Sequence, residues 1–276
     1  MCSSDLAVDD TMRTLAWQPQ PLLARSGDRR YDMQDDADEL ADQVAELDRL
    51  TAGAICWRLG EHRASDFGGA GLVVANPAVP LASEWLELAE ASGARVTTEM
   101  GLFWELCPAR TIAVTGSNGK STTSAMIHSI LEASGQKAWL GGNIGGSLLD
   151  QLETIGPDDW VVLELSSFQL EHLNRQHAAP DIAVVTNFTP NHLDRHGTLD
   201  AYRHAKQAIL RWQSPDAVCV LSELDPDVPS WTVAANRLGF GIDRGVGAGV
   251  FLRDERSDEH TSELQSQAYL VCRRLL

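Results

Sequence analysis

The sequence lacks most of the features that would tie it to a membrane, a disulfide framework or a nucleic acid. Its five cysteines are scattered and form no Cys-x-x-Cys pair, so we expect neither disulfides nor a zinc site. No apolar run approaches the ~20 residues of a membrane span. A formal net charge of -17 argues against sequence-independent binding to nucleic acid or to an anionic membrane. The scattered cysteines fit a reducing cytoplasm. We also expect a monomeric globular protein that acts on small molecules.

The first hundred residues predict a small α/β domain but carry no catalytic motif. Apolar residues spaced i, i+4, i+7 predict an amphipathic helix over residues 38–50. Residues 71–75 and 95–98 have the composition of short strands, and residues 83–92 that of a helix between them. The first strand and glycine turn of such a domain, which usually face a nucleotide, are not visible. We expect a truncated Rossmann-like domain here.

The clearest signal is the glycine turn within residues 111–123, TIAVTGSNGKSTT. A β-branched, apolar run predicts a buried strand before the turn, and helical composition follows it. Glycines let backbone N–H groups approach an anion, the helix N-terminus adds positive potential, and a lysine adds a charge. The spacing G-x-x-G-K-S is shorter than the usual phosphate-binding loop, and the alternative is a structural helix-entry turn. We predict a phosphate site at Gly116, Ser117, Asn118, Gly119, Lys120, Ser121 and Thr122.

From residue 111 onward, strand-like and helical segments alternate regularly. Strands are expected at residues 111–115, 137–140, 160–164, 181–187 and 217–221, with helices notably at 121–134 and 199–212. Such alternation predicts a P-loop-type, doubly wound and mainly parallel sheet. After residues 239–243 the pattern fades into glycine-rich and charged sequence.

Polar residues that are unusual for a core follow several of these strands. Asn143, Glu164, Ser166, Asn187 and His192 all stand at the end of an expected strand or shortly after it. Because the carboxyl ends of parallel strands share one edge of a sheet, these residues are expected to converge on the glycine turn.

Two of these residues, and one lysine further along, leave alternatives open. Glu164 ends a buried strand and could hold Mg²⁺, or it could only cap the next helix. His192 could be a metal ligand, a substrate hydrogen-bond donor or a loop histidine. Lys206 lies on the helix expected at 199–212 and, from composition alone, is predicted to be a solvated surface lysine.

Five ordered motifs resemble the Mur ligases, the family that builds the peptide of peptidoglycan. They are TGSNGKSTT, GGNIGGSLL, VVLELSSFQLE, NFTPNHLDRHG and YRHAKQAIL. The strong match runs from about residue 110 to about residue 221, and residues 71–99 match more loosely. ELSSFQLE is most similar to the members that join glutamate to UDP-N-acetylmuramoyl-L-alanine. Rival hypotheses are another Mur ligase, a folylpolyglutamate synthetase and a non-catalytic nucleotide-binding module.

The resemblance implies a role for each motif. The glycine turn would wrap the β- and γ-phosphates of ATP, and Ser121 with Glu164 would hold one Mg²⁺. His192 would help to hold a second Mg²⁺ together with Lys206 in its N-carboxylated (carbamate) form. The residues implied to face UDP-N-acetylmuramoyl-L-alanine are Asn143, Ser166, Gln169 and His192. The implied catalytic residues are Lys120, Glu164, His192 and Lys206.

The resemblance also suggests how the chain is divided. We expect a truncated UDP-substrate domain over residues 1–107, an ATP-binding central domain over 108–255, and a non-native or disordered tail over 256–276. Residues 1–6 and 256–266 resemble translated sequencing adapter. The family's N-terminal uridine-facing glycine motif, its adenine-side motif and its C-terminal domain have no match. We therefore expect a ligase fragment that is inactive as given.

Overall fold

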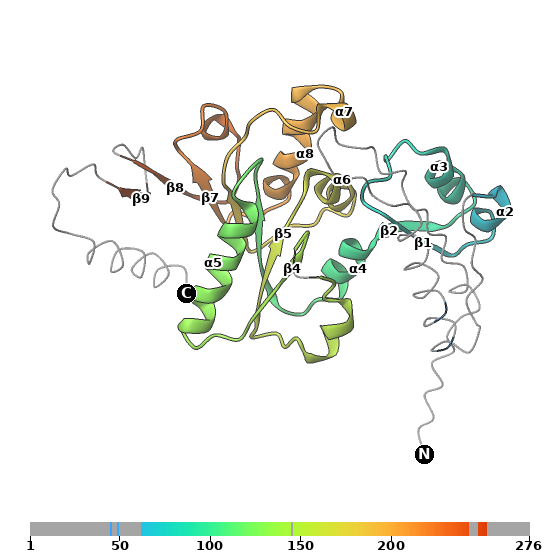
Figure 1. Cartoon of the computed structure of the whole chain (residues 1–276), viewed down its shortest axis with the longest axis horizontal. Coiled ribbons are helices and arrows are strands. Elements are labelled where there is room, and N and C mark those ends of the chain that lie inside the picture. Colours follow the sequence, from blue (N-terminus) through green and yellow to red (C-terminus); the bar gives the residue numbers. More distant parts are fainter. Residues whose placement is uncertain (1–44, 46–48, 50–61, 145, 243–247, 253–276) are drawn as a thin grey trace, which may run out of the picture. The chain divides into compact units, whose positions relative to one another are not determined.

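The computed structural model describes residues 45, 49, 62–144, 146–242 and 248–252 (Figure 1). Most of the helix expected at residues 38–50, and all of the segments 1–6 and 256–276, lie outside the described residues. The chain divides into two compact units, Met1–Thr98 and Glu99–Leu276. No helix in the described part of the chain is long and apolar enough to cross a membrane.

Within residues 62–98, the first unit contains a two-stranded parallel sheet with two helices. Strand β1 pairs with β2 in the register Leu72↔Arg95, and α2 and α3 pack beside them around a small core of Phe67, Ala89 and Ala94. The elements are α2 (Ala64–Phe67), β1 (Leu72–Ala75), α3 (Glu84–Ala91) and β2 (Arg95–Thr98). The two predicted strands and the predicted helix between them are confirmed.

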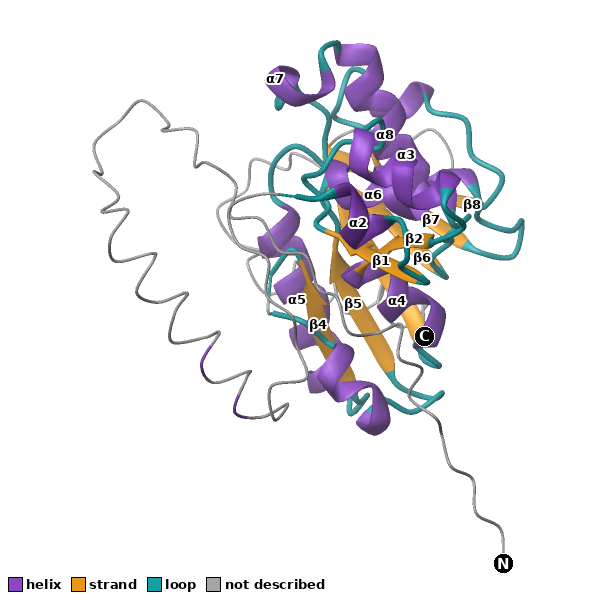
Figure 2. Cartoon of the chain, turned by 90° about the vertical axis from the view of Figure 1, so that its right-hand side faces the viewer, coloured by secondary structure: helices purple, strands orange, loops and turns teal. Residues whose placement is uncertain are grey.

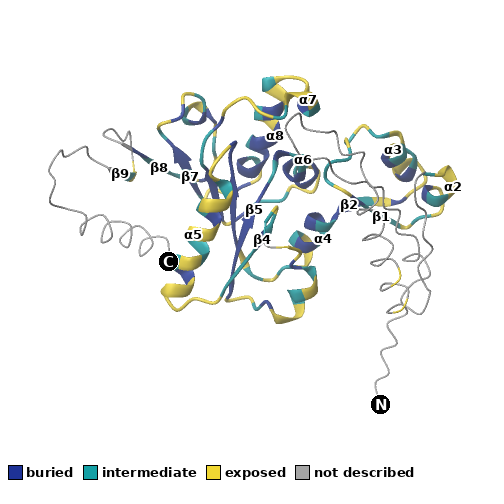
Figure 3. Ribbon diagram, viewed as in Figure 1, coloured by how far each residue is buried: buried dark blue, intermediate teal, exposed yellow. Residues whose placement is uncertain are grey.

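The second unit is built on a seven-stranded parallel sheet in the order β4-β5-β3-β6-β7-β8-β9. Its strands are β3 (Arg110–Thr115), β4 (Ala138–Gly142), β5 (Trp160–Glu164), β6 (Ile182–Val185), β7 (Val218–Ser222), β8 (Asn236–Ile242) and β9 (Gly249–Leu252). Every residue of β5 and β6 is buried (Figure 3), as expected for the centre of a sheet covered on both faces. The predicted fold class is confirmed.

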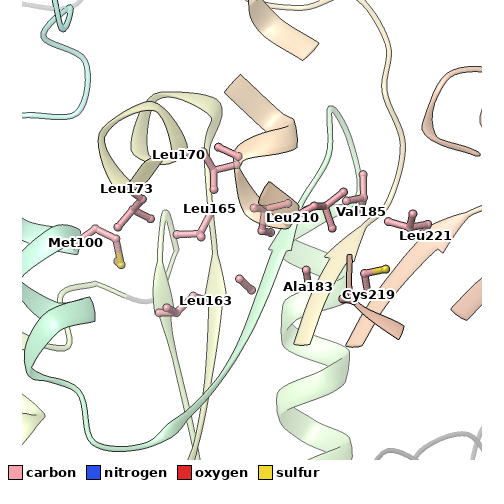
Figure 4. Packing of buried hydrophobic residues seen from close by; sticks show 14 of the residues in the cluster. Met100, Leu163, Leu165, Leu170, Leu173, Ala183, Val185, Leu210, Cys219 and Leu221 are labelled. Carbon is pink, nitrogen blue, oxygen red and sulfur yellow. The ribbon is translucent and has the colours of Figure 1, made fainter. Parts of the chain in front are cut away.

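Side chains along the central strands alternate between two cores. Ile112, Val114 and Val162 belong to the core that Leu131 of α5 joins. Ala113 and Leu163 belong to the larger core with α4, α6 and α8, which Figure 4 shows from close by. Helices therefore cover both faces of the sheet (Figure 2). The helices are α4 (Glu99–Leu106), α5 (Lys120–Ala133), α6 (Ser167–Arg175), α7 (Leu193–His196) and α8 (Leu199–Arg211), with short 3-10 turns at η2 (Leu149–Thr154) and η3 (Val228–Ser230).

Strands β8 and β9 were not predicted, because the glycine-rich and charged sequence in and around them shows no strand period. Strand β8 contains Gly239 and Gly241, which weaken strand propensity. Its place comes from backbone pairing with β7, in the register Cys219↔Arg237 and Leu221↔Gly239. The structure thus extends the sheet by tertiary pairing where the side-chain pattern carries little information.

Candidate functional site: the phosphate loop and the adjoining strand ends

The glycine turn lies between β3 and α5, and both of its glycines have positive φ. Gly116 has φ 148° and Gly119, the N-cap of α5, has φ 79°. A Cβ added to Gly116 would lie 1.9 Å from Oγ1 of Thr186, so a side chain does not fit there. Helix α5 begins at Lys120, and its first N–H groups have no carbonyl one turn earlier within the helix. Together with the helix dipole, these groups suit an anion such as phosphate.

The side chain of Ser117 anchors the loop to the segment that follows β6. Its Oγ donates to the Thr189 carbonyl at 2.8 Å, accepts from the Thr189 N–H at 2.9 Å, and lies 3.1 Å from the Tyr202 hydroxyl. Only 6% of Ser117 is exposed, so its hydroxyl is directed into the protein. Nζ of Lys120 donates to the Ser117 carbonyl at 3.2 Å, which keeps the lysine folded over its own loop.

Glu164 ends β5 with its carboxylate only half satisfied. It is 1% exposed, and its Oε1 accepts from Nδ2 of Asn143 at 2.9 Å. Its Oε2 has no hydrogen-bond partner among the described residues. Buried polar atoms are rarely left unpaired, and a carboxylate oxygen is a ligand that Mg²⁺ prefers. The residues present therefore fit a hard cation at this oxygen.

The alternative that Glu164 caps the following helix is wrong. Ser166 is the N-cap of α6, and with Gln169 it forms a capping box in which each side chain bonds to the other's backbone N–H. Gln169 Oε1 accepts from the Ser166 N–H at 2.9 Å, and Ser166 Oγ accepts from the Gln169 N–H at 3.2 Å. Their structural role is clear, and their contact with a substrate stays a prediction.

Asn143 lies beside Glu164 because Gly142, the residue before it, allows the two backbone segments to approach closely. The Asn143 N–H donates to the Glu164 carbonyl at 2.8 Å. Gly142 has φ 99°, and a Cβ there would lie 2.2 Å from that same carbonyl oxygen. The structure thus brings Asn143 to Glu164 directly, and whether Asn143 also contacts a substrate stays a prediction.

His192 caps the short helix α7 with φ 51°. Its ring centroid lies 5.2 Å from that of Phe168 on α6 and 6.3 Å from that of Tyr202 on α8. One turn later, the buried His196 places Nε2 2.9 Å from Ser167 Oγ. Burial and the charge of nearby Arg195 lower the pKa of His196 to about 4, so it is neutral at physiological pH.

The prediction from composition that Lys206 is a surface residue is wrong. It is 1% exposed, and its Nζ donates to the Gly116 carbonyl at 2.7 Å and to Thr115 Oγ1 at 3.4 Å. Burial lowers the pKa of Lys206 to about 7, and the charge of Lys120 acts in the same direction, while Glu164 raises it.

A sequence signal for this burial existed. Tyr202, Ala205 and Ile209 are buried, and together with Lys206 they have the spacing i, i+3, i+4, i+7 of the inner face of α8. Thr186 and Tyr202 also contact the loop but could not be predicted, because in such segments a threonine and a tyrosine are indistinguishable from ordinary core residues.

Comparisons with known proteins identify the family to which the chain is similar. The protein-family model described as the Mur ligase middle domain matches residues 114–268. The UDP-N-acetylmuramoylalanine–D-glutamate ligase of Roseiflexus sp. is 43% identical over 196 residues, which are 71% of this chain and 42% of that protein. The enzyme of the same name from Symbiobacterium thermophilum is 40% identical over 224 residues, 80% of this chain and 48% of the relative. The chain thus spans less than half of the length of these relatives.

Among solved structures, one similar chain is the UDP-N-acetylmuramate:L-alanyl-gamma-D-glutamyl-meso-diaminopimelate ligase from Neisseria meningitides. It is 18% identical with a TM-score of 0.49, and the match covers 78% of this chain and 68% of that one.

Proposed function

Because this chain belongs to the Mur ligase family, we propose that it is the ATP-binding part of a UDP-N-acetylmuramoylalanine–D-glutamate ligase. The observation that carries the proposal is the convergence at one sheet edge of three features. These are the phosphate loop, the buried carboxylate of Glu164, one oxygen of which has no partner in the described part of the chain, and a buried lysine bonded to the loop at Lys206. The names of the relatives at about 40% identity indicate D-glutamate as the amino acid.

The proposed reaction joins a carboxylate to an amine in two steps. The carboxylate of UDP-N-acetylmuramoyl-L-alanine attacks the γ-phosphorus of ATP, and ADP leaves, so that an acyl phosphate forms. The amine of D-glutamate then attacks the acyl carbon, loses a proton, and phosphate leaves as the amide forms. Activation is needed because a free carboxylate would have to expel oxide. The enzyme must hold two negatively charged reactants in line, which a positively charged loop assists.

Residues of this chain would bind and orient the phosphates. The N–H groups at the start of α5 and the ammonium group of Lys120 would contact the β- and γ-phosphates. Ser121 and Glu164 would hold Mg²⁺, whose charge would offset that of the phosphates. In the described residues, no three His, Cys, Asp or Glu side chains lie close enough together to hold a metal, so phosphate and water would supply further ligands.

We also propose that Lys206 carries a carbamate. With its pKa near 7, a large fraction of the amine is uncharged at neutral pH. The nitrogen lone pair could attack the carbon of CO₂, and loss of one proton to solvent would leave the carbamate. This changes a cation into an anion with two oxygen ligands, which with His192 would suit a second Mg²⁺.

The remaining assignments follow from the family. Asn143, Ser166, Gln169 and His192 would face the UDP-linked substrate. The protein would work in the cytoplasm, in the synthesis of the peptidoglycan precursor that cell-wall growth, shape and division require. The residues that hold the incoming amino acid would come from parts of the enzyme that this chain does not match.

The test is an assay of the complete gene, recovered from its genomic reading frame, against a panel of acceptors. Phosphate release and product mass would be measured with ATP, Mg²⁺, and either UDP-N-acetylmuramoyl-L-alanine or a folate, each with D- or L-glutamate. We expect an amide only from the UDP-linked acceptor with D-glutamate. A folate product would instead favour a folylpolyglutamate synthetase, and binding without product would favour a nucleotide-binding module.

Two controls sharpen this assay. Lys120→Ala should abolish turnover and leave the circular dichroism spectrum unchanged. Residues 1–276 alone should release phosphate slowly and form no amide, because the acceptor amine is not held in line. Amide formation by that chain at roughly 1 per second or faster, the range of ordinary enzymes, would show that nothing further is needed.

A further inference from the structure

We propose that Asn187 is a positioning residue that sets which backbone N–H groups of the phosphate loop face the nucleotide. The inference rests on the proposed function, in that it assumes a phosphate at this loop. Asn187 follows β6, and its hydrogen bonds to the loop reach backbone groups of Ser117 and Asn118.

Asn187 bonds to both backbone groups of one loop residue. Its Oδ1 accepts from the Asn118 N–H at 2.9 Å, and its Nδ2 donates to the Asn118 carbonyl at 2.9 Å. Its own carbonyl accepts from the Ser117 N–H at 3.0 Å. The side chain therefore pairs with the loop as a neighbouring strand would, although β6 has already ended at Val185.

Thr186, the residue before Asn187, adds hydrogen bonds to the same part of the chain. Oγ1 of Thr186 donates to the same Asn118 carbonyl at 2.6 Å and to the Thr115 carbonyl at 3.2 Å. Since a Cβ on Gly116 would collide with that oxygen, the loop lies directly against this segment. Through these hydrogen bonds, the two residues after β6 hold the backbone of the loop in one conformation.

As a consequence, some N–H groups of the loop are hydrogen-bonded within the protein and others are available to a ligand. Those of Ser117 and Asn118 are engaged by Asn187 and cannot bind an anion at the same time. The groups that remain able to bind phosphate include those of residues 119–122, where the backbone turns through Gly119 into α5. Without Asn187, the Asn118 peptide could rotate, and the four N–H groups would lose their common direction.

The test compares ATP with AMP, because only ATP reaches the loop with β- and γ-phosphates. Dissociation constants of both nucleotides, each with Mg²⁺, would be measured by calorimetry for residues 1–276 and for Asn187→Ala and Asn187→Asp. The Asp variant keeps the size and the acceptor but loses the donor to the Asn118 carbonyl. Asn236→Ala is the matched control, because its Nδ2 also donates to a backbone carbonyl, that of Pro215 at 2.9 Å, at the opposite end of the strands.

We expect Asn187→Ala to weaken ATP binding about tenfold, as for the loss of two neutral hydrogen bonds, and to leave AMP binding unchanged. Asn187→Asp should weaken ATP binding at least as much, because it also adds a negative charge beside the phosphates. Asn236→Ala should leave the ratio of the two affinities as it is in the wild type.

Each other outcome has a defined meaning. Unchanged ATP binding in both Asn187 variants, or equal weakening of ATP and AMP, would overturn the positioning role and leave a structural one. Equal affinity of the wild-type chain for ATP and AMP would overturn the phosphate site itself, and the positioning role with it. If Asn187→Ala does not fold, as judged by circular dichroism, Asn187→Asp decides.

Discussion

The ends of β5 and β6 look alike in the sequence but behave differently in the structure. Both strands finish in a short polar segment at the same edge of the sheet. After β6, Thr186 and Asn187 direct their polar atoms to the backbone of the phosphate loop. After β5, Glu164 has one oxygen bonded to Asn143 and the other without a partner among the described residues.

This difference separates residues that shape a site from residues that are available to a ligand. Polar groups whose hydrogen bonds are all made within the protein stabilise one backbone conformation. A buried carboxylate oxygen with no partner destabilises the fold unless something else binds to it. We infer that the end of β6 forms the loop, while the end of β5 meets the ligand. Five predictions test and extend this contrast.

The largest effect is expected for Glu164→Gln. In the complete enzyme, turnover should fall about 10³-fold, as for the loss of several kcal/mol of charge stabilisation. Stability of residues 1–276 to urea should stay the same or rise, because a neutral amide replaces a buried charge and the acceptor for Asn143 remains. Glu132→Gln, at the exposed end of α5, is the control. Wild-type turnover in Glu164→Gln would remove the distinction between the two strand ends.

Gly116→Ala should lower the free energy of unfolding by about 2–3 kcal/mol, since the new Cβ has no room beside Thr186. Gly135→Ala is the matched control. It also has positive φ, 79°, but no described atom lies within 4 Å of its added Cβ, so it should lose only about 1 kcal/mol from backbone strain. Urea denaturation measures both, and equal losses would show that the loop is not pressed against β6.

Lys206 should make stability depend on pH. Its pKa falls from 10.5 to about 7 on folding, so the unfolded chain binds more protons between these values. Stability should therefore rise with pH from about 7 toward 10.5, by at most about 1.4 kcal/mol per pH unit. Lys206→Met should flatten this slope in urea denaturation at a series of pH values. An unchanged slope would mean that the amine is not buried as a free base.

The carbamate adds a separate test of the same residue in the complete enzyme. Lys206→Ala should lose activity and regain part of it with added acetate, which can supply the missing carboxylate oxygens. Turnover of the wild type should also depend on dissolved CO₂. Full activity of Lys206→Ala without acetate would contradict the carbamate.

The smallest effect is expected for Thr186→Val, which removes one hydroxyl donor to the loop. A loss of about 1 kcal/mol in the free energy of unfolding is expected from a hydrogen bond of this kind. Thr154→Val is the control, because its hydroxyl also donates to a backbone carbonyl, that of Gln151 at 2.8 Å, but on an exposed turn. If the two losses are the same, the hydroxyl of Thr186 has no special part in holding the loop.

Much of the fold could be predicted because the relevant signals are local. The apolar run ending at Glu164 predicts β5 with the bounds that the structure has, Trp160–Glu164. The glycine turn predicts the entry to α5. Strands β8 and β9 could not be predicted in this way, since glycines and charged residues give no period, and only the pairing of β8 with β7 and of β9 with β8 locates them.

The sequence by itself determined which residues gather at one edge of the sheet, because strand order along the chain and parallel pairing place every strand end on the same side. It also determined the glycine turn, because only glycine tolerates the backbone angles and the close approach found at Gly116. Only the tertiary structure decided whether each polar atom at this edge is buried and which atom it is hydrogen-bonded to. Burial of Lys206, the pairing of Asn187 with Asn118, and the unpartnered oxygen of Glu164 all depend on residues 20 or more positions away. Hydrogen bonding and desolvation depend on the residues that are neighbours in space, and a sequence motif does not show which residues these are.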